Sequence, residues 1–163
     1  MLDTATAFFL AGERCAPPLS FGKYKEHTVS APCIVCHALA AEIGMKLLLI
    51  LSDIPVPKGK NGHKLRGLYE ALPCDAKDEL RWVEDHLDEM NDSFVDWRYP
   101  YERDFLAASG DEIRRAFILV YRQIRKVRRS LLSVYEENWG QFDPDWQLAW
   151  HEIEASPTMD TAP

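Results

Sequence analysis

Two residues of this sequence have the chemistry to hold a phosphate or to move a proton. His63 follows a glycine-containing loop at an expected helix start, so its imidazole could act as a general base or donate a hydrogen bond to a phosphate. Arg98 lies between Trp97 and Tyr99, and its guanidinium could clamp a phosphate through two parallel hydrogen bonds. Each residue also has a structural interpretation. His63 could hold its loop on a neighbouring helix, and Arg98 could stack on its aromatic neighbours.

Glu42 and Lys46 supply a second set of charges. They are four residues apart with the acid first, which is the favourable order for a helical ion pair. In one interpretation this ion pair is purely structural. In the other, the two side chains join Arg98 and His63 in a polar cluster that binds a ligand.

Aromatic and acidic residues follow Arg98 directly. Tyr99 and Tyr101 flank Pro100, and they could present a stacking face or a hydroxyl to a nucleobase. Alternatively, these tyrosines close the end of a helical bundle. Glu102 could pair with Arg98, so this segment contributes candidate binding residues in either case.

The four cysteines are Cys15, Cys33, Cys36 and Cys74. The run from Cys33 to His37 matches the haem-attachment pattern letter for letter, but it opens an apolar helix, and haem attachment requires export. A zinc site would need a second pair of ligands, whereas Cys15 and Cys74 are single residues. We therefore predict reduced thiols that pack as small apolar side chains, with no metal and no cofactor.

The composition is that of one globular domain. The chain has 163 residues, of which 47% are hydrophobic, and its formal net charge is -7. An acidic protein of this kind contacts RNA only through a local basic patch. The first ten residues contain no Lys or Arg, and His37, Glu42 and Lys46 interrupt the longest apolar run. These features argue against a signal peptide and a membrane span and favour a cytoplasmic protein.

Apolar residues recur at helical spacing along most of the chain, and no segment alternates as a strand does. A loop is expected from Cys15 to Thr28. We predict helices at 2–15, 30–51 and 63–72, a long one from Asp75 onward, and a last one that begins at Ser109 or Asp111. The apolar positions of the long helix are Leu80, Val83, Leu87, Met90, Phe94 and Trp97. The pattern predicts an all-α fold, an antiparallel bundle of four to five helices in which 30–51 is buried on two sides.

The last predicted helix is strongly basic, with Arg114, Arg115, Arg122, Arg125, Lys126, Arg128 and Arg129 beside its apolar positions. This face could balance the negative charge of the neighbouring helix predicted from Asp75 onward, bind phosphates, or meet an acidic face in a homodimer. Residues 1–136 form the predicted bundle. Residues 137–163 form a Trp-rich acidic tail, partly helical or disordered, that could dock on its own chain or on a partner.

Three motifs of the chain, taken together, resemble the HEPN domain (higher eukaryotes and prokaryotes nucleotide-binding). They are the Glu42-x-x-x-Lys46 helix, the Gly62-His63-x-Leu65 helix start and the segment Trp97-Arg98-Tyr99-Pro100-Tyr101-Glu102. The resemblance covers about residues 1–136. It implies an all-α bundle, often a symmetric dimer, in a superfamily with many metal-independent ribonucleases, some of them toxins or phage-defence enzymes. Other members bind RNA, nucleotides or partner proteins without cleavage.

The sequence departs from the catalytic pattern of that family, an arginine followed by a histidine five to seven positions later. Arg98 falls where such an arginine is expected, but no histidine follows it at that spacing. The pattern recurs at Arg81 and His86, although five helical positions turn the two side chains roughly 140° apart. Three hypotheses follow: binding of RNA or a nucleotide with weak or no catalysis, a ribonuclease using His63 and Arg98 or Arg81 and His86, and a helical module for an antitoxin-like protein.

Overall fold

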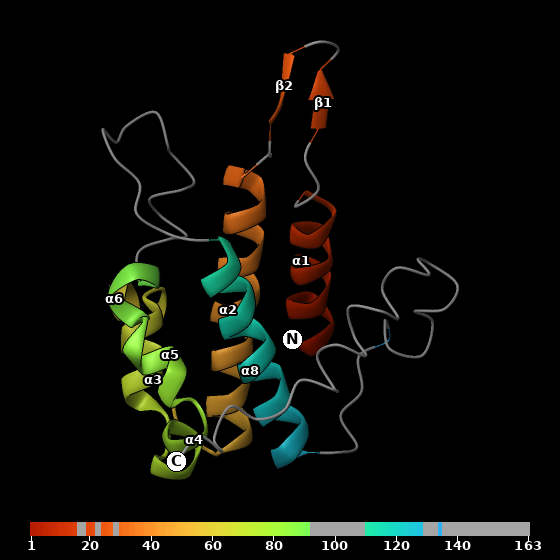
Figure 1. Cartoon of the computed structure of the whole chain (residues 1–163). Coiled ribbons are helices and arrows are strands. Elements are labelled where there is room, and N and C mark those ends of the chain that lie inside the picture. The colour runs from red at the N-terminus through yellow and green to blue at the C-terminus, as the bar shows by residue number, and fades with distance from the viewer. Residues whose placement is uncertain (16–18, 22–23, 28–29, 92–109, 129–133, 135–163) are drawn as a thin grey trace, which may run out of the picture.

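The computed structural model describes residues 1–15, 19–21, 24–27, 30–91, 110–128 and 134, and this part of the chain is mostly helical, as predicted. Figure 1 labels a short hairpin and the α-helices. The elements in chain order are α1 (Leu2–Cys15), β1 (Leu19–Phe21), β2 (Tyr24–His27), α2 (Ser30–Leu51), η1 (Gly59–Gly62), α3 (Leu65–Ala71), α4 (Cys74–Glu79), α5 (Arg81–Asp85), α6 (Leu87–Met90) and α8 (Gly110–Val127).

The hairpin corrects the prediction of a loop between Cys15 and Thr28. Its two strands are antiparallel, with Leu19 opposite His27 and Phe21 opposite Tyr24. The strands have three and four residues. Segments this short contain too few side chains for a period-two pattern to emerge, so the alternation test could not detect them.

Helices α1, α2 and α8 lie side by side (Figure 1). Glu13 near the end of α1, His37 near the start of α2 and Arg114 near the start of α8 meet in one cluster. Therefore α1 runs antiparallel to α2, whereas α8 runs parallel to it. The bundle is thus not antiparallel throughout. After α2 the chain returns to the end of the bundle at which α2 begins, and α8 starts there.

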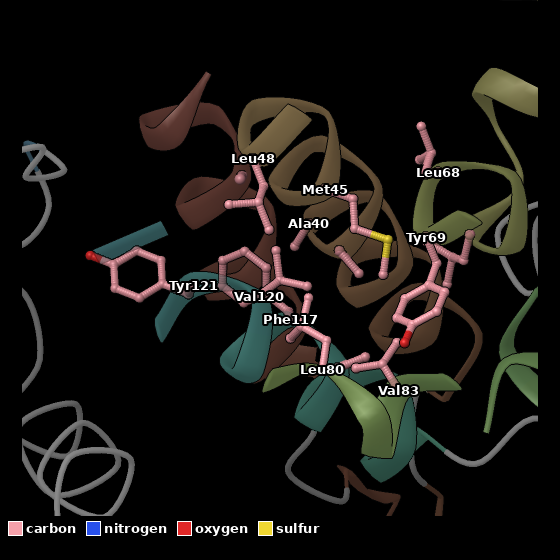
Figure 2. Close-up of a cluster of buried hydrophobic side chains, with 14 of the residues drawn as sticks. Ala40, Met45, Leu48, Leu68, Tyr69, Leu80, Val83, Phe117, Val120 and Tyr121 are labelled. Atoms are coloured by element: carbon pink, nitrogen blue, oxygen red, sulfur yellow. The ribbon is translucent and has the colours of Figure 1, made fainter. Parts of the chain in front are cut away.

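Helix α2 is the centre of the core, and its predicted burial on two sides is confirmed. It packs against α1, α8 and α3. Side chains from α2, α3, α8 and the region around α4 and α5 turn toward one another in Figure 2. Ala31–Leu51 is long and apolar enough to cross a membrane by length and composition, but 61% of its most apolar window is buried inside the structure. A buried core helix of a globular protein has the same composition.

The long helix predicted from Asp75 onward is three short helices, α4, α5 and α6. Its predicted apolar positions Leu80, Val83, Leu87 and Met90 are all buried, whereas Phe94 and Trp97 lie outside the described residues. The second break has a visible cause. The His86 ring donates from Nδ1 to the Trp82 carbonyl at 2.8 Å, and the His86 backbone N–H bonds to Val83 instead. A side chain that occupies the carbonyl four residues earlier interrupts the helical ladder.

Candidate functional site

Glu42, Lys46 and His63 meet on one side of α2, and we call them the Glu42 cluster. The Lys46 ammonium donates to Glu42 Oε1 at 2.6 Å, one helical turn away. His63 Nδ1 lies 3.1 Å from the same oxygen, from the turn that precedes α3. Because a carboxylate oxygen accepts, Nδ1 must carry the proton of this hydrogen bond. In a neutral ring this leaves the lone pair on Nε2.

The three side chains differ sharply in exposure. Glu42 is 5% exposed, and its second oxygen, Oε2, is fully buried without a hydrogen-bond partner in the described structure. Lys46 is 19% exposed and His63 is 64% exposed. Buried polar atoms are nearly always paired, so an unused carboxylate oxygen beside an accessible imidazole is an unusual feature.

A tightly folded loop brings His63 to α2. A Cβ atom at Gly62 would lie 2.4 Å from the Pro57 carbonyl oxygen, so only glycine lets the chain fold back this closely. The next residue, His63, then faces Glu42. The structural interpretation of His63, a histidine that holds its loop on the central helix, therefore agrees with the observed contact, and its exposed ring remains available for chemistry.

The structure joins only part of the predicted site. Glu42, Lys46 and His63 lie in contact. Arg98, which the second interpretation of the ion pair places beside them, lies outside the described residues, as do the other candidates Tyr99, Tyr101 and Glu102.

The alternative catalytic pair is not assembled within one chain. Arg81 is exposed. His86 is half-buried and stacks on Trp82, with ring centroids 4.1 Å apart. No hydrogen bond or ring contact in the described structure connects Arg81 with His86, which agrees with the divergence expected on a helix.

A second polar cluster, which the sequence analysis missed, joins α1, α2 and α8. We call it the Glu13 cluster. Arg114 donates from Nε and Nη2 to the two carboxylate oxygens of Glu13 at 2.7 and 2.9 Å. His37 is 1% exposed, and its Nε2 lies 3.0 Å from Glu13 Oε1 in a close but poorly aligned contact. Its Nδ1 lies 3.6 Å from Cys33 Sγ. Gly12 makes room for the ring, because a Cβ there would lie 2.4 Å from it.

The order thiol, imidazole, carboxylate is that of a nucleophilic relay, but this thiol is not activated. Burial, followed by the negative charge of Glu13, raises the pKa of Cys33 to about 11. The thiol therefore stays protonated at neutral pH and is a poor nucleophile. Cys33 is buried as predicted, whereas Cys74 is exposed. Within the described residues, no group of three or more His, Cys, Asp or Glu side chains could hold a metal ion.

Electrostatics agree with a structural role for the Glu13 cluster. Burial by itself raises the pKa of Glu13, but the close contact with His37 and the hydrogen bonds and positive charge of Arg114 outweigh burial and leave the pKa below its usual value. On the basic helix α8, Arg114 pairs with Glu13 and Lys126 pairs with Glu79. The Lys126–Glu79 pair agrees with the interpretation in which the basic face balances the acidic helix predicted from Asp75 onward, whereas Arg114 pairs with an acid of α1.

No protein-family model, no curated protein and no solved structure matches this chain. The geometry of the two clusters and the motifs of the sequence are therefore the features that bear on function.

Proposed function

We propose that this chain is a HEPN-like protein that binds RNA or a nucleotide at the Glu42 cluster, with weak or no catalysis, as a cytoplasmic homodimer. The observation that carries the proposal is the buried Glu42 carboxylate with one unpartnered oxygen beside an accessible imidazole. Because that oxygen is fully buried, a ligand would meet the cluster at the exposed His63 ring, which Glu42 Oε1 holds through a hydrogen bond. The Lys46 ammonium and the exposed ring of His63 would face a phosphate of the ligand.

The energetics of burial support a functional reason for the cluster. Removing Glu42 and Lys46 from water costs free energy, and hydrophobic residues of similar volume often stabilise a core as well or better. Apart from His37, the other residues of α2 that face the core are apolar. Charged groups retained among apolar side chains are better explained by ligand binding than by a purely structural role. The largely buried α2 fits a cytoplasmic protein, and sedimentation velocity would test the dimer.

Binding is tested by fluorescence anisotropy with a labelled single-stranded RNA pool and with a labelled nucleotide, at low and physiological salt. Glu42→Gln, Lys46→Met and His63→Ala should each weaken binding about tenfold or more, because each removes a contact to the ligand or the hydrogen bond that holds such a contact in place. Lys58→Ala is the matched control, since Lys58 is an exposed lysine outside the cluster. Unchanged affinity in all three cluster variants, with the fold intact by circular dichroism, would refute the proposal.

The hydrogen bond between His63 and Glu42 favours a second candidate, a metal-independent endoribonuclease. A carboxylate that holds one imidazole nitrogen orients the other as a base. His63 Nε2 would take the proton of an RNA 2′-hydroxyl, the 2′-oxygen would attack the adjacent phosphorus, and the 5′-oxygen of the next nucleotide would leave with a proton. The products are a 2′,3′-cyclic phosphate and a 5′-hydroxyl end.

Incubation with an RNA pool in EDTA, scored for cyclic phosphate ends, tests this candidate. Loss of cleavage in His63→Ala but not in His86→Ala would assign the base to the Glu42 cluster, and Arg98→Ala would test the predicted partner. Cleavage lost only in His86→Ala would move the site to the alternative pair. Cleavage that survives all three changes would exclude both sites.

A further inference from the structure

One side of α2 is open to solvent along most of its length, although this helix is the centre of the core. Gly44 faces α8, since a Cβ there would lie 3.0 Å from Val120, and the open positions point away from that contact. These positions are exposed or half-buried and recur at steps of three or four residues, so they share one face of the helix. We call this face the α2 stripe. It consists of Pro32, Val35, Leu39, Ile43, Lys46 and Ile50.

Helix α1 widens the apolar surface on one side of the stripe. Burial, and then the negative charge of Cys15, raise the pKa of Cys36, so the end of α1 lies beside this part of α2. Phe8 is half-buried and precedes Cys15 by seven residues, which puts both on one side of α1. Met1 is another seven residues back and 50% exposed, and Ile50 is 47% exposed. Large apolar side chains thus meet solvent along two neighbouring helices, which is typical of an interaction surface.

The α2 stripe is nearly free of charge, on a protein of which 28% of the residues are charged. Lys46 is the charged member of the stripe, and Glu42 neutralises it at 2.6 Å. The exposed positions of α4, α5 and α6 are, by contrast, mostly acidic. Depletion of charge marks the core of a protein–protein interface, whereas a nucleic acid requires a basic surface. The stripe therefore fits a protein partner whose own surface is equally apolar.

We propose that a second copy of this chain covers the α2 stripe, with the two stripes packed against each other. A symmetric dimer uses the same patch on both copies, so the patch must be complementary to itself, as an uncharged apolar ridge is. From Pro32 to Ile50 the stripe is about 27 Å long. Together with the adjoining edge of α1, each copy would bury about 500 Å², or about 1,000 Å² for the pair, which reaches the size of a specific interface.

This inference rests on the homodimer of the proposed function and assigns its interface. Lys46 belongs to the stripe and also to the Glu42 cluster. The two Glu42 clusters of a dimer would therefore lie at the edge of the shared interface, with the exposed ring of His63 outside it.

The test is sedimentation velocity of the full chain over a range of micromolar concentrations. The wild type should sediment as a dimer, and raising the salt concentration should not dissociate it, because salt screens charges and does not weaken apolar contacts. A dimer that dissociates as the salt concentration rises would be held by charges, such as those of basic α8 and acidic α4 to α6, and would overturn the assignment to the stripe.

Ile50→Arg is the decisive variant. It places an unpaired charge in the interface and should raise the dissociation constant of the dimer about tenfold or more. Val127→Arg is the matched control, because Val127 is 45% exposed but lies on α8, away from the stripe. It should dimerise like the wild type, and circular dichroism should show the same helix content in both variants.

The possible failures are distinguishable. A wild-type dimer that Ile50→Arg does not weaken would overturn the interface and leave the homodimer in place. A monomeric wild type would overturn the interface and the homodimer together, while the anisotropy measurements would still report on binding at the Glu42 cluster.

Discussion

Helix α2 contributes to two polar clusters, each built from a carboxylate, a histidine and a cation, and the two differ in how the carboxylate is paired and how far the histidine is exposed. In the Glu13 cluster, Arg114 engages both carboxylate oxygens of Glu13, and the histidine is almost completely buried. In the Glu42 cluster, Lys46 and His63 share one carboxylate oxygen, and the other oxygen is unpartnered.

An acid and a histidine in contact do not by themselves make a reactive site. At the Glu13 cluster the carboxylate is fully paired with Arg114, the His37 ring is sealed from solvent, and burial keeps the neighbouring thiol protonated. That cluster connects three helices. At the Glu42 cluster the exposed imidazole can meet a solute, and the carboxylate has hydrogen-bonding capacity that the described fold does not use. The first cluster should therefore control stability, and the second should control binding.

The largest effect should come from filling the space that Gly12 leaves for His37. The Cβ of Gly12→Ala would lie 2.4 Å from the imidazole, which Cys33, Glu13 and Phe9 hold in place. Overpacking costs about 1–3 kcal/mol, and the better helix propensity of alanine returns about 1 kcal/mol of that. We expect a net loss of up to about 2 kcal/mol in the free energy of unfolding, measured by urea denaturation.

A double-mutant cycle separates this clash from other effects. In the His37→Ala background the ring is absent, so adding Gly12→Ala should be neutral or stabilising. An equal cost in both backgrounds would show that Gly12 does not accommodate His37.

A smaller effect should appear as a pH dependence. The pKa of Glu13 is lower in the folded state than its usual value of 4.5, despite burial, because His37 and Arg114 stabilise the carboxylate. A lowered folded-state pKa contributes stability above the unfolded-state pKa, and this contribution is lost as the pH falls through the folded-state value. Glu13→Gln lacks it. The stability difference between wild type and Glu13→Gln should therefore be largest near neutral pH and should shrink below about pH 4.5.

Urea denaturation from pH 7 to pH 3 measures this difference. Glu42→Gln is a useful comparison, because it removes a buried carboxylate of the other cluster. If the gap between wild type and Glu13→Gln stays constant over the whole range, ionised Glu13 does not stabilise the fold, and the Glu13 cluster loses its assigned role.

The sequence predicted those features that depend on neighbouring residues. The bounds of α1 and α2 agree with the predicted helices, since Pro17, Pro18 and the Ser30-x-Pro32 start act locally. The pairing of Glu42 with Lys46 is equally local. The break at His86 was missed because one side chain there competes with the backbone, which apolar spacing does not reveal.

The Glu13 cluster was missed for a different reason. Glu13 and Arg114 are 101 residues apart in the chain, and they meet only once α1, α2 and α8 have packed. Spacing rules describe contacts within one helix and cannot specify which faces of three helices meet. Gly12 was the available signal, because a glycine inside a helix often has a packing reason, and here the reason is the His37 ring.

The smallest effect on stability should come from the residue with the largest predicted effect on binding. His63 is 64% exposed, so its hydrogen bond to Glu42 competes with water and should contribute no more than about 0.5 kcal/mol. His63→Ala should thus unfold at nearly the wild-type urea concentration while losing affinity for RNA or nucleotide. Equal losses of stability and binding would mean that His63 only holds the loop on α2. Retained stability with lost binding would separate the two clusters as the geometry requires, because no purely structural histidine produces that combination.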